Sequence, residues 1–190
     1  DIRHTIIRNG TGNAFNASGT LSPFTISSCT VQNYSGYGIN GGATNPIITN
    51  CLFQDIGGYG IYMGSGSITN SKVQNAGGYG IYMTSGALTG CTIDSTGNYP
   101  LSMYADNVAT MGVTFTNITA KPGIEIRGGT VSVTGTWSNF GMPYIITSYI
   151  NIQGLSAPIL TLAAGDTIKF APGQYLYVGS SNSGGLIANG

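Results

Sequence analysis

The chain has 190 residues, only 6% of them charged, and its six basic and six acidic residues cancel. That balance excludes the basic surface that binding to nucleic acid or to an anionic membrane requires, and the 41% of apolar residues exclude disorder driven by charge. No apolar run approaches the ~20 residues that span a bilayer, so no membrane insertion is expected.

A four-residue motif, Gly-Tyr-Gly-Ile, recurs in the first half of the chain. It occupies residues 36–39, 58–61 and 78–81, and a degenerate copy, Asn-Tyr-Pro-Leu, occupies 98–101. The same register extends to Phe15 upstream and to Ile124 and Ile145 downstream. The motif returns about every 20 residues, and a fixed period of this length predicts a repeat architecture.

Three more columns of similar residues share this register over seven copies. The first holds mostly small residues: Thr5, Cys29, Cys51, Ser71, Cys91, Val113 and Gly135. The second, two residues later, is apolar: Ile7, Val31, Phe53, Val73, Ile93, Phe115 and Trp137. The third, two residues later again, is polar: Asn9, Asn33, Asp55, Asn75, Ser95, Asn117 and Asn139. Columns of this kind are expected where identical positions stack on one another.

Apolar and polar residues alternate between the turns, as at 51–54 and 81–83. Alternation with β-branched residues predicts short strands and argues against helical repeats. Leucine-rich repeats have a similar period, but they need a density of leucine that this chain lacks. We therefore predict an all-β parallel β-solenoid of about eight or more coils, with stacked strands about 4.8 Å apart. The polar column is expected to point inward as an asparagine ladder that bonds backbone groups.

These features resemble the pectin-lyase-like superfamily of right-handed parallel β-helices. The resemblance rests on the length of the coils and on the asparagine column, and it covers roughly the first 150 positions of the chain. It implies the right-handed fold, of the kind found in bacterial and archaeal cell-surface and extracellular proteins. It implies no single function, because the fold hosts lyases, hydrolases, adhesins and phage spikes.

The register changes after about residue 150. Alternating segments continue at 150–152, 160–162, 168–170, 176–178 and 186–188, separated by turns such as Ala-Gly and Pro-Gly. We expect residues 151–190 to form shorter coils that continue the solenoid of residues 1–150 as a single domain.

The three cysteines share one column, and we expect them to be buried free thiols. Cys51 and Cys91 are two coils apart, about 9.6 Å, which exceeds the ~7 Å limit for a disulfide. Cys29 and Cys51 lie on adjacent coils, but parallel stacking points both side chains the same way.

The acids are too sparse and too scattered for the chemistry of the enzymes that use this fold. An inverting glycosidase needs two carboxyls about 6.5–9.5 Å apart. The chain has five aspartates and one glutamate, and no two of them fall on adjacent coils of one outward column. Its only histidine, His4, has no acid beside it in its column. We therefore expect no catalytic residue, no metal and no cofactor.

One outward face combines aromatic and charged residues. Tyr62 and Tyr82 share a column with Glu125, and Tyr104 and Arg127 lie beside it. Tyrosine rings can stack on sugars while an acid and a guanidinium bond hydroxyls. The competing interpretation is a surface ladder that stabilises the sheet through pairs of like residues.

The ends of the solenoid need cover, because an open end exposes apolar side chains and strand edges. Ile2 and Ile7 lie at one end, and Leu186 and Ala188 lie at the other. The partner is expected to be the chain itself, end to end, or the remainder of a longer chain.

The leading hypothesis is a structural or adhesive element of a cell surface or extracellular filament. A carbohydrate-binding module or stalk, with a polysaccharide as its partner, is the second hypothesis. A polysaccharide lyase or hydrolase is the third.

Overall fold

The computed structural model describes residues 1–17, 24–42 and 44–189. The described chain is all-β apart from one 3-10 helix, so the predicted fold class of stacked parallel coils is confirmed. It divides into two compact units: residues 1–102 with 110–122, and residues 103–109 with 123–190. The boundary expected at residue 150 stays a prediction.

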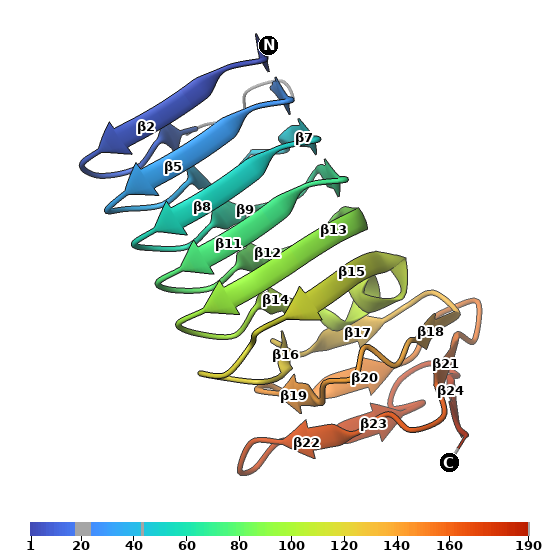
Figure 1. Cartoon of the computed structure of the whole chain (residues 1–190). Helices are drawn as coiled ribbons and strands as arrows, with labels where there is room; N and C mark the ends of the chain where they lie inside the picture. The colour runs from blue at the N-terminus through green and yellow to red at the C-terminus, as the bar shows by residue number, and fades with distance from the viewer. Residues whose placement is uncertain (18–23, 43, 190) are drawn as a thin grey trace. The chain divides into compact units, whose positions relative to one another are not determined.

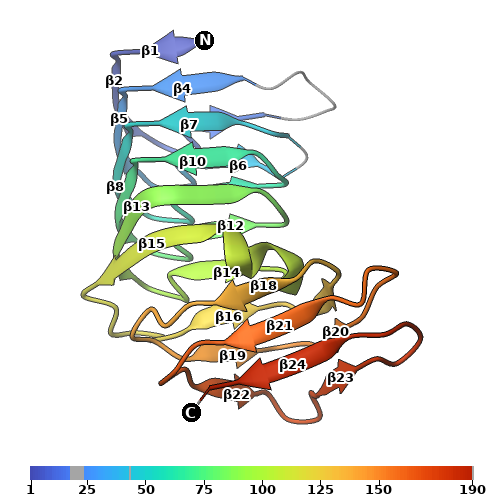
Figure 2. The ribbon, with the colours of Figure 1, turned by 90° about the vertical axis from the view of Figure 1, so that its right-hand side faces the viewer.

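Each coil of the first unit runs along three faces (Figures 1 and 2). The first face stacks β1 (Ile2–Arg3), β4 (Thr25–Ser27), β7 (Ile47–Thr49), β10 (Ser67–Thr69) and the start of β13 (Ala87–Thr96). The second stacks β2 (Ile6–Gly10), β5 (Thr30–Tyr34), β8 (Leu52–Ile56), β11 (Lys72–Ala76), the end of β13 and β15 (Met111–Thr116). The third stacks β3 (Phe15–Asn16), β6 (Ile39–Gly41), β9 (Ile61–Met63), β12 (Ile81–Met83) and β14 (Leu101–Met103). The helix η1 (Ala105–Thr110) lies between β14 and β15 in the chain.

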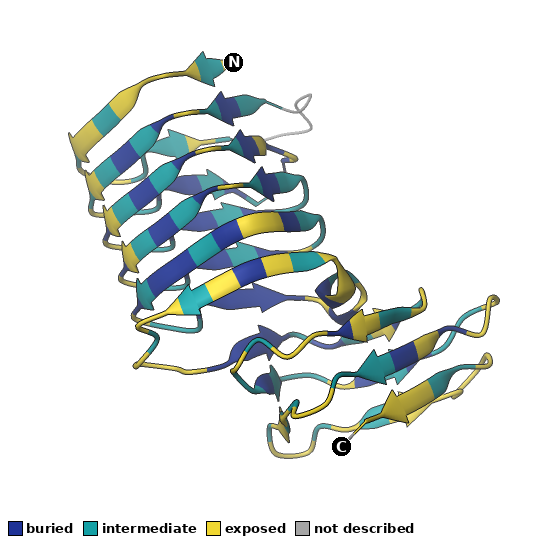
Figure 3. Ribbon diagram, turned by 45° about the vertical axis from the view of Figure 1, so that its right-hand side comes forward, coloured by how far each residue is buried: buried dark blue, intermediate teal, exposed yellow. Residues whose placement is uncertain are grey.

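The apolar column forms the core of the first unit. Val31 pairs with Phe53, Phe53 with Val73 and Val73 with Ile93, and these four side chains are at most 1% exposed. Most strands of this unit alternate between buried and more exposed residues (Figure 3), as the alternation in the sequence predicts, whereas β14 is buried throughout. The register predicted for residues 7–115 is therefore confirmed.

The inward position predicted for the asparagine column is wrong. Six of its seven members have backbone φ between 53° and 63°, and most of the column is exposed: Asn9, Asn33, Asp55, Asn75, Ser95 and Asn117. These residues turn the corner after the second face in the left-handed conformation, which asparagine and aspartate tolerate better than other residues with a side chain. The column therefore reflects a backbone requirement at an outer corner.

A second left-handed corner lies between the first and second faces. Its residues directly precede the cysteine column: His4, Ser28, Asn50, Asn70 and Gly90. Behind this corner the cysteines are buried and free, as expected. The thiols of Cys51 and Cys91 donate to backbone carbonyls of Thr49 and Ile68 at 3.3 Å, and burial raises the pKa of both thiols.

The two glycines of the Gly-Tyr-Gly-Ile motif have different steric roles. A Cβ on Gly58 or Gly78 would lie 2.4 or 2.5 Å from the tyrosine ring of the preceding coil. A Cβ on Gly80, the second glycine of its copy, would lie 2.5 Å from both Ile93 and the carbonyl oxygen of Pro100. The first glycine leaves room for the tyrosine column, and the second lets neighbouring coils approach each other.

The second unit also stacks strands on three faces. They are β16 (Ile124–Ile126), β19 (Tyr144–Ile146) and β22 (Ile168–Phe170); β17 (Gly129–Val131), β20 (Ile150–Ile152) and β23 (Leu176–Val178); and β18 (Gly135–Trp137), β21 (Ile159–Leu162) and β24 (Gly185–Ala188). All five alternating segments predicted beyond residue 150 are strands. The shorter coils predicted there are not found: Ile150 pairs with Leu176 and Leu160 with Leu186, a longer step along the chain than in the first unit.

The register predicted for Ile145 is wrong by one residue. Ile124 pairs with Tyr144, which is fully buried, and Glu125 pairs with Ile145. The Tyr144 hydroxyl donates to the carbonyl of Ser138 at 2.6 Å, so this ring occupies the inward column without leaving its polar atom unbonded.

Candidate functional site

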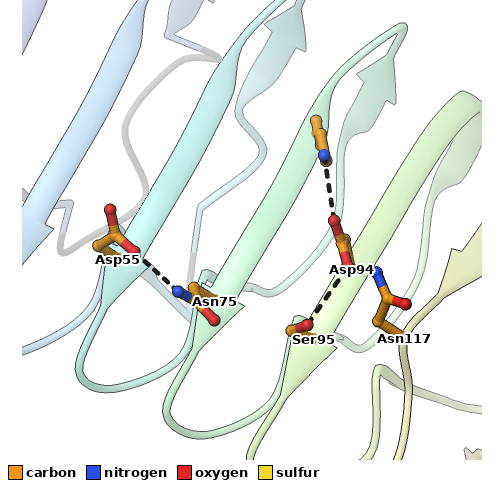
Figure 4. Close-up of polar contacts among 6 residues, drawn as sticks. Asp55, Asn75, Asp94, Ser95 and Asn117 are labelled. Atoms are coloured by element: carbon orange, nitrogen blue, oxygen red, sulfur yellow. Dashed lines mark hydrogen bonds and ion pairs between the residues drawn. The ribbon is translucent and has the colours of Figure 1, made fainter.

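The main polar cluster of the first unit surrounds Asp94 on the second face (Figure 4). Its Oδ1 accepts hydrogen bonds from Asn117 Nδ2 at 2.9 Å and from Ser95 Oγ at 3.3 Å. Its Oδ2 lies 3.2 Å from Lys72 Nζ. Asp94 thus links three successive coils, because Lys72 belongs to β11, Asp94 to β13, and Asn117 follows β15.

This environment favours the ionised form of Asp94. The hydrogen bond from Asn117 is the largest influence, and with Lys72 and Ser95 it holds the pKa of the carboxyl below its usual value against the opposing effect of burial. A carboxylate in this state is a poor general acid at neutral pH. Its geometry suits a permanent link between coils.

A hollow of about 260 Å³ lies beside this cluster. Its lining is made of corner and turn residues: Asn75, Ala76, Gly77, Ser95, Thr96, Gly97, Asn117 and Thr119. Within the described ranges, no group of three or more histidine, cysteine or acidic side chains is placed to hold a metal ion.

All five aspartates accept hydrogen bonds from the chain itself. Asp55 accepts from Asn75 Nδ2 at 2.9 Å, Asp106 from Ser132 Oγ at 2.7 Å, and Asp1 pairs with Arg3 at 3.0 Å. Asp166 accepts from the backbone N–H of Ala163 at 3.1 Å, and burial raises the pKa of Asp166. Each of these carboxylates therefore has a structural partner within the chain.

Tyr62 and Tyr82, predicted as part of a sugar-binding face, belong to a cluster of half-buried tyrosines in the first unit. The other members come from the turn column: Tyr37, Tyr59, Tyr79 and Tyr99. Tyr37 and Tyr59 stack with centroids 4.6 Å apart and planes 6° apart, and Tyr82 lies 5.9 Å from Tyr59 at 26°. The faces of Tyr59 are therefore turned towards other rings, which favours the interpretation as a stabilising ladder.

The other residues predicted for that face lie in the second unit. Tyr104 is 37% exposed, and the guanidinium of Arg127 lies over its ring, 4.4 Å from the centroid. Glu125 is only 8% exposed, so it does not offer the open carboxylate that the sequence suggested. Whether any of the five residues binds a glycan stays a prediction.

Sequence reasoning missed a second tyrosine cluster. Tyr149, Tyr175 and Tyr177 are 48%, 45% and 49% exposed, and they lie together on the second unit. The signal was present in the spacing: Tyr149 and Tyr175 directly precede Ile150 and Leu176, which are paired. It was overlooked because the step between these coils is longer than the period of the first coils.

The predicted end residues differ in exposure. Ile2 and Ile7 are half-buried, although Ile6 between them is 66% exposed. Leu186 is 40% exposed and Ala188 is exposed, next to Ile187 at 46%.

Residues 1–89 match the family model of the right handed beta helix region. With the stacked parallel coils, this match supports the superfamily that the columns indicated. No curated protein and no solved structure matches the chain. Among the described residues, no helix is long and apolar enough to span a membrane.

Proposed function

Taking the chain as a right-handed parallel β-helix, we propose that it is a structural and adhesive solenoid of a cell surface or extracellular filament. The observation that carries this proposal is that all five aspartates are bonded to groups of the chain itself. Each aspartate accepts a hydrogen bond from the chain or forms an ion pair with it. The partners of Asp94 come from three successive coils and favour its ionised form. A lyase or hydrolase of this fold would need carboxylates directed at a substrate instead.

The apolar edge of the second unit supports a role in assembly. In the described part of the chain, β22, β23 and β24 each pair with one neighbouring strand. Phe170, Val178 and Leu186 on these strands are 40–45% exposed. Strand edges that carry apolar side chains favour the addition of another coil. We propose that this coil comes from another copy of the chain, end to end, or from the remainder of a longer chain.

The extracellular location rests on the resemblance to a superfamily found in cell-surface and extracellular proteins. The low charge, 6% of residues, suits close packing in such assemblies because few charges need to be desolvated.

Incubation with polysaccharides tests the non-catalytic part of the proposal. Pectin, polygalacturonate and neutral glucans, with and without calcium, are expected to yield neither unsaturated products nor new reducing ends. Product formation by the wild-type protein that Asp94→Asn abolishes, with the fold retained by circular dichroism, would refute the structural assignment of Asp94.

A further inference from the structure

The sheet formed by β17, β20 and β23 has a distinctive outer face. Its inward residues Val131, Ile150 and Ile152 are at most 3% exposed. The residues between them point outward in one column, where Thr130 pairs with Asn151 and Asn151 with Tyr177. The outer face therefore carries a hydroxyl, an amide and a phenol on three successive coils.

Two more tyrosines extend this column into an aromatic platform, defined as Tyr149, Tyr175 and Tyr177. The rings of Tyr149 and Tyr175 stack with centroids 5.7 Å apart and planes 19° apart. Tyr177 meets Tyr175 edge to face at 4.7 Å. Each of the three residues is nearly half exposed, whereas the six clustered tyrosines of the first unit are less exposed and pack against one another.

A glycine stands on the preceding coil at the position that corresponds to the first ring of the platform. Gly128 occupies the position that corresponds to Tyr149, since Gly129 pairs with Ile150. Gly128 has a φ of 77°, and a Cβ there would lie 2.6 Å from the carbonyl oxygen of Tyr149. The Tyr149 ring consequently has no side chain at the matching position of that coil.

The two charged side chains that flank β17 are engaged within the chain: Arg127 lies over the ring of Tyr104, and Asp106 accepts hydrogen bonds from Ser132. No charged residue occurs between Arg127 and Asp166, or after Lys169. The side chains of Thr130 and Asn151 make no hydrogen bond to other described residues, so a ligand can use both. A ligand that suits this face has apolar patches, hydroxyl groups and no net charge.

The size of the platform favours a narrow ligand. Three rings of roughly 200 Å², each about half exposed, offer about 300 Å². A stable protein partner would need about 800 Å² on each side. A few sugar rings in a row match the smaller area, because a pyranose presents C–H groups on its face and hydroxyls at its edge.

We propose that the platform binds a neutral polysaccharide chain of the β-glucan type. Tyr149 and Tyr177 contact the faces of the sugar rings, while Thr130 and Asn151 bond their hydroxyls. This inference rests on the proposed adhesive function and gives it a ligand class and a site.

Titration calorimetry of the full chain with cellohexaose, and pull-down on insoluble cellulose, test the proposal. We expect the wild type to bind both probes and polygalacturonate to compete poorly. The double variant Tyr149→Ala/Tyr177→Ala is expected to bind at least ten-fold more weakly, since two ring contacts are lost. Leu155→Ala, which changes a fully exposed apolar residue of the same unit outside the platform, is the control and is expected to keep binding. Thermal melts check that all variants are folded.

Three results would overturn the proposal: no binding by the wild type, undiminished binding by the double variant, or equal binding of polygalacturonate. Self-association that the double variant abolishes, without glycan binding, would assign the platform to a second copy of the chain instead. These outcomes leave the structural proposal intact, which fails separately if the chain degrades a polysaccharide.

Discussion

Asn75 shows how a single residue both turns the backbone at a corner and bonds one coil to the next. Its φ of 57° places it in the left-handed region, and its Nδ2 donates to Asp55 on the preceding coil at 2.9 Å. The sequence identified this column correctly from its period. It did not reveal that the column is exposed, because the period is the same for an inward residue and for a residue at an outer corner.

Asn75→Ala should destabilise the protein by about 1–2 kcal/mol, since alanine is strained at positive φ and the ladder bond is lost. Asn75→Gly should cost roughly 1 kcal/mol less than alanine, because glycine adopts this conformation freely. Gln74→Ala, on the same strand but without the backbone requirement, is the control and should change stability by less than about 0.5 kcal/mol. Urea midpoints measure all three; equal midpoints for the alanine and glycine variants would show that φ is unimportant here.

Asp94 makes the stability of the first unit depend on pH. Its pKa in the folded protein is lowered, so the unfolded state binds a proton more readily than the folded state. The stabilisation is therefore present above the unfolded pKa of about 4 and is lost as the pH falls through the lowered folded pKa. Urea midpoints should fall between pH ~6 and pH ~2 by more in the wild type than in Asp94→Asn. The same pH dependence in both proteins would contradict this role.

At the scale of elements, the glycines of the repeated motif set how closely the coils approach. The sequence predicted strands and registers well where the period is short and regular, because identical positions repeat. The predicted registers were wrong where the turns between strands become longer. The insertion of residues around Leu155, which is fully exposed, cannot be located from a column pattern. Tyr144 replaced Ile145 in the core because an aromatic residue with a bonded hydroxyl fills an inward position as well as an aliphatic one does.

Gly80→Ala should destabilise the first unit by about 1–3 kcal/mol, because the added methyl overlaps both Ile93 and a backbone oxygen of the next coil. Gly112→Ala is the matched control: its Cβ would meet its nearest atoms at 3.4 Å, and its φ is not positive. That change should stay within about 1 kcal/mol of the wild type. Thermal unfolding followed by circular dichroism compares them, and a neutral Gly80→Ala would contradict the close packing assigned to the motif.

At the scale of the whole molecule, the candidate site differs from the one predicted. The sequence indicated a sugar-binding face from Tyr62, Tyr82, Tyr104, Glu125 and Arg127. The structure packs the first two against other tyrosines and buries Glu125. Tyr149, Tyr175 and Tyr177 form the more open surface, because the neighbours of Tyr149 and Tyr177 on the preceding coils are Gly128 and Asn151, which are small or polar. Exposure of this kind depends on neighbouring coils and cannot be seen in one segment of sequence.

Sedimentation velocity over a range of concentrations tests the proposed stacking of coils most directly. The apparent mass of the wild type should rise above the 19.5 kDa of one chain as concentration increases. Leu186→Asp should remain at the single-chain mass, because a charge on the exposed edge of β24 must be desolvated when a coil is added. Leu186 is already 40% exposed, so this variant should keep its fold. A wild type that stays monomeric at every concentration, with the amides of β22–β24 protected from hydrogen exchange, would contradict the account.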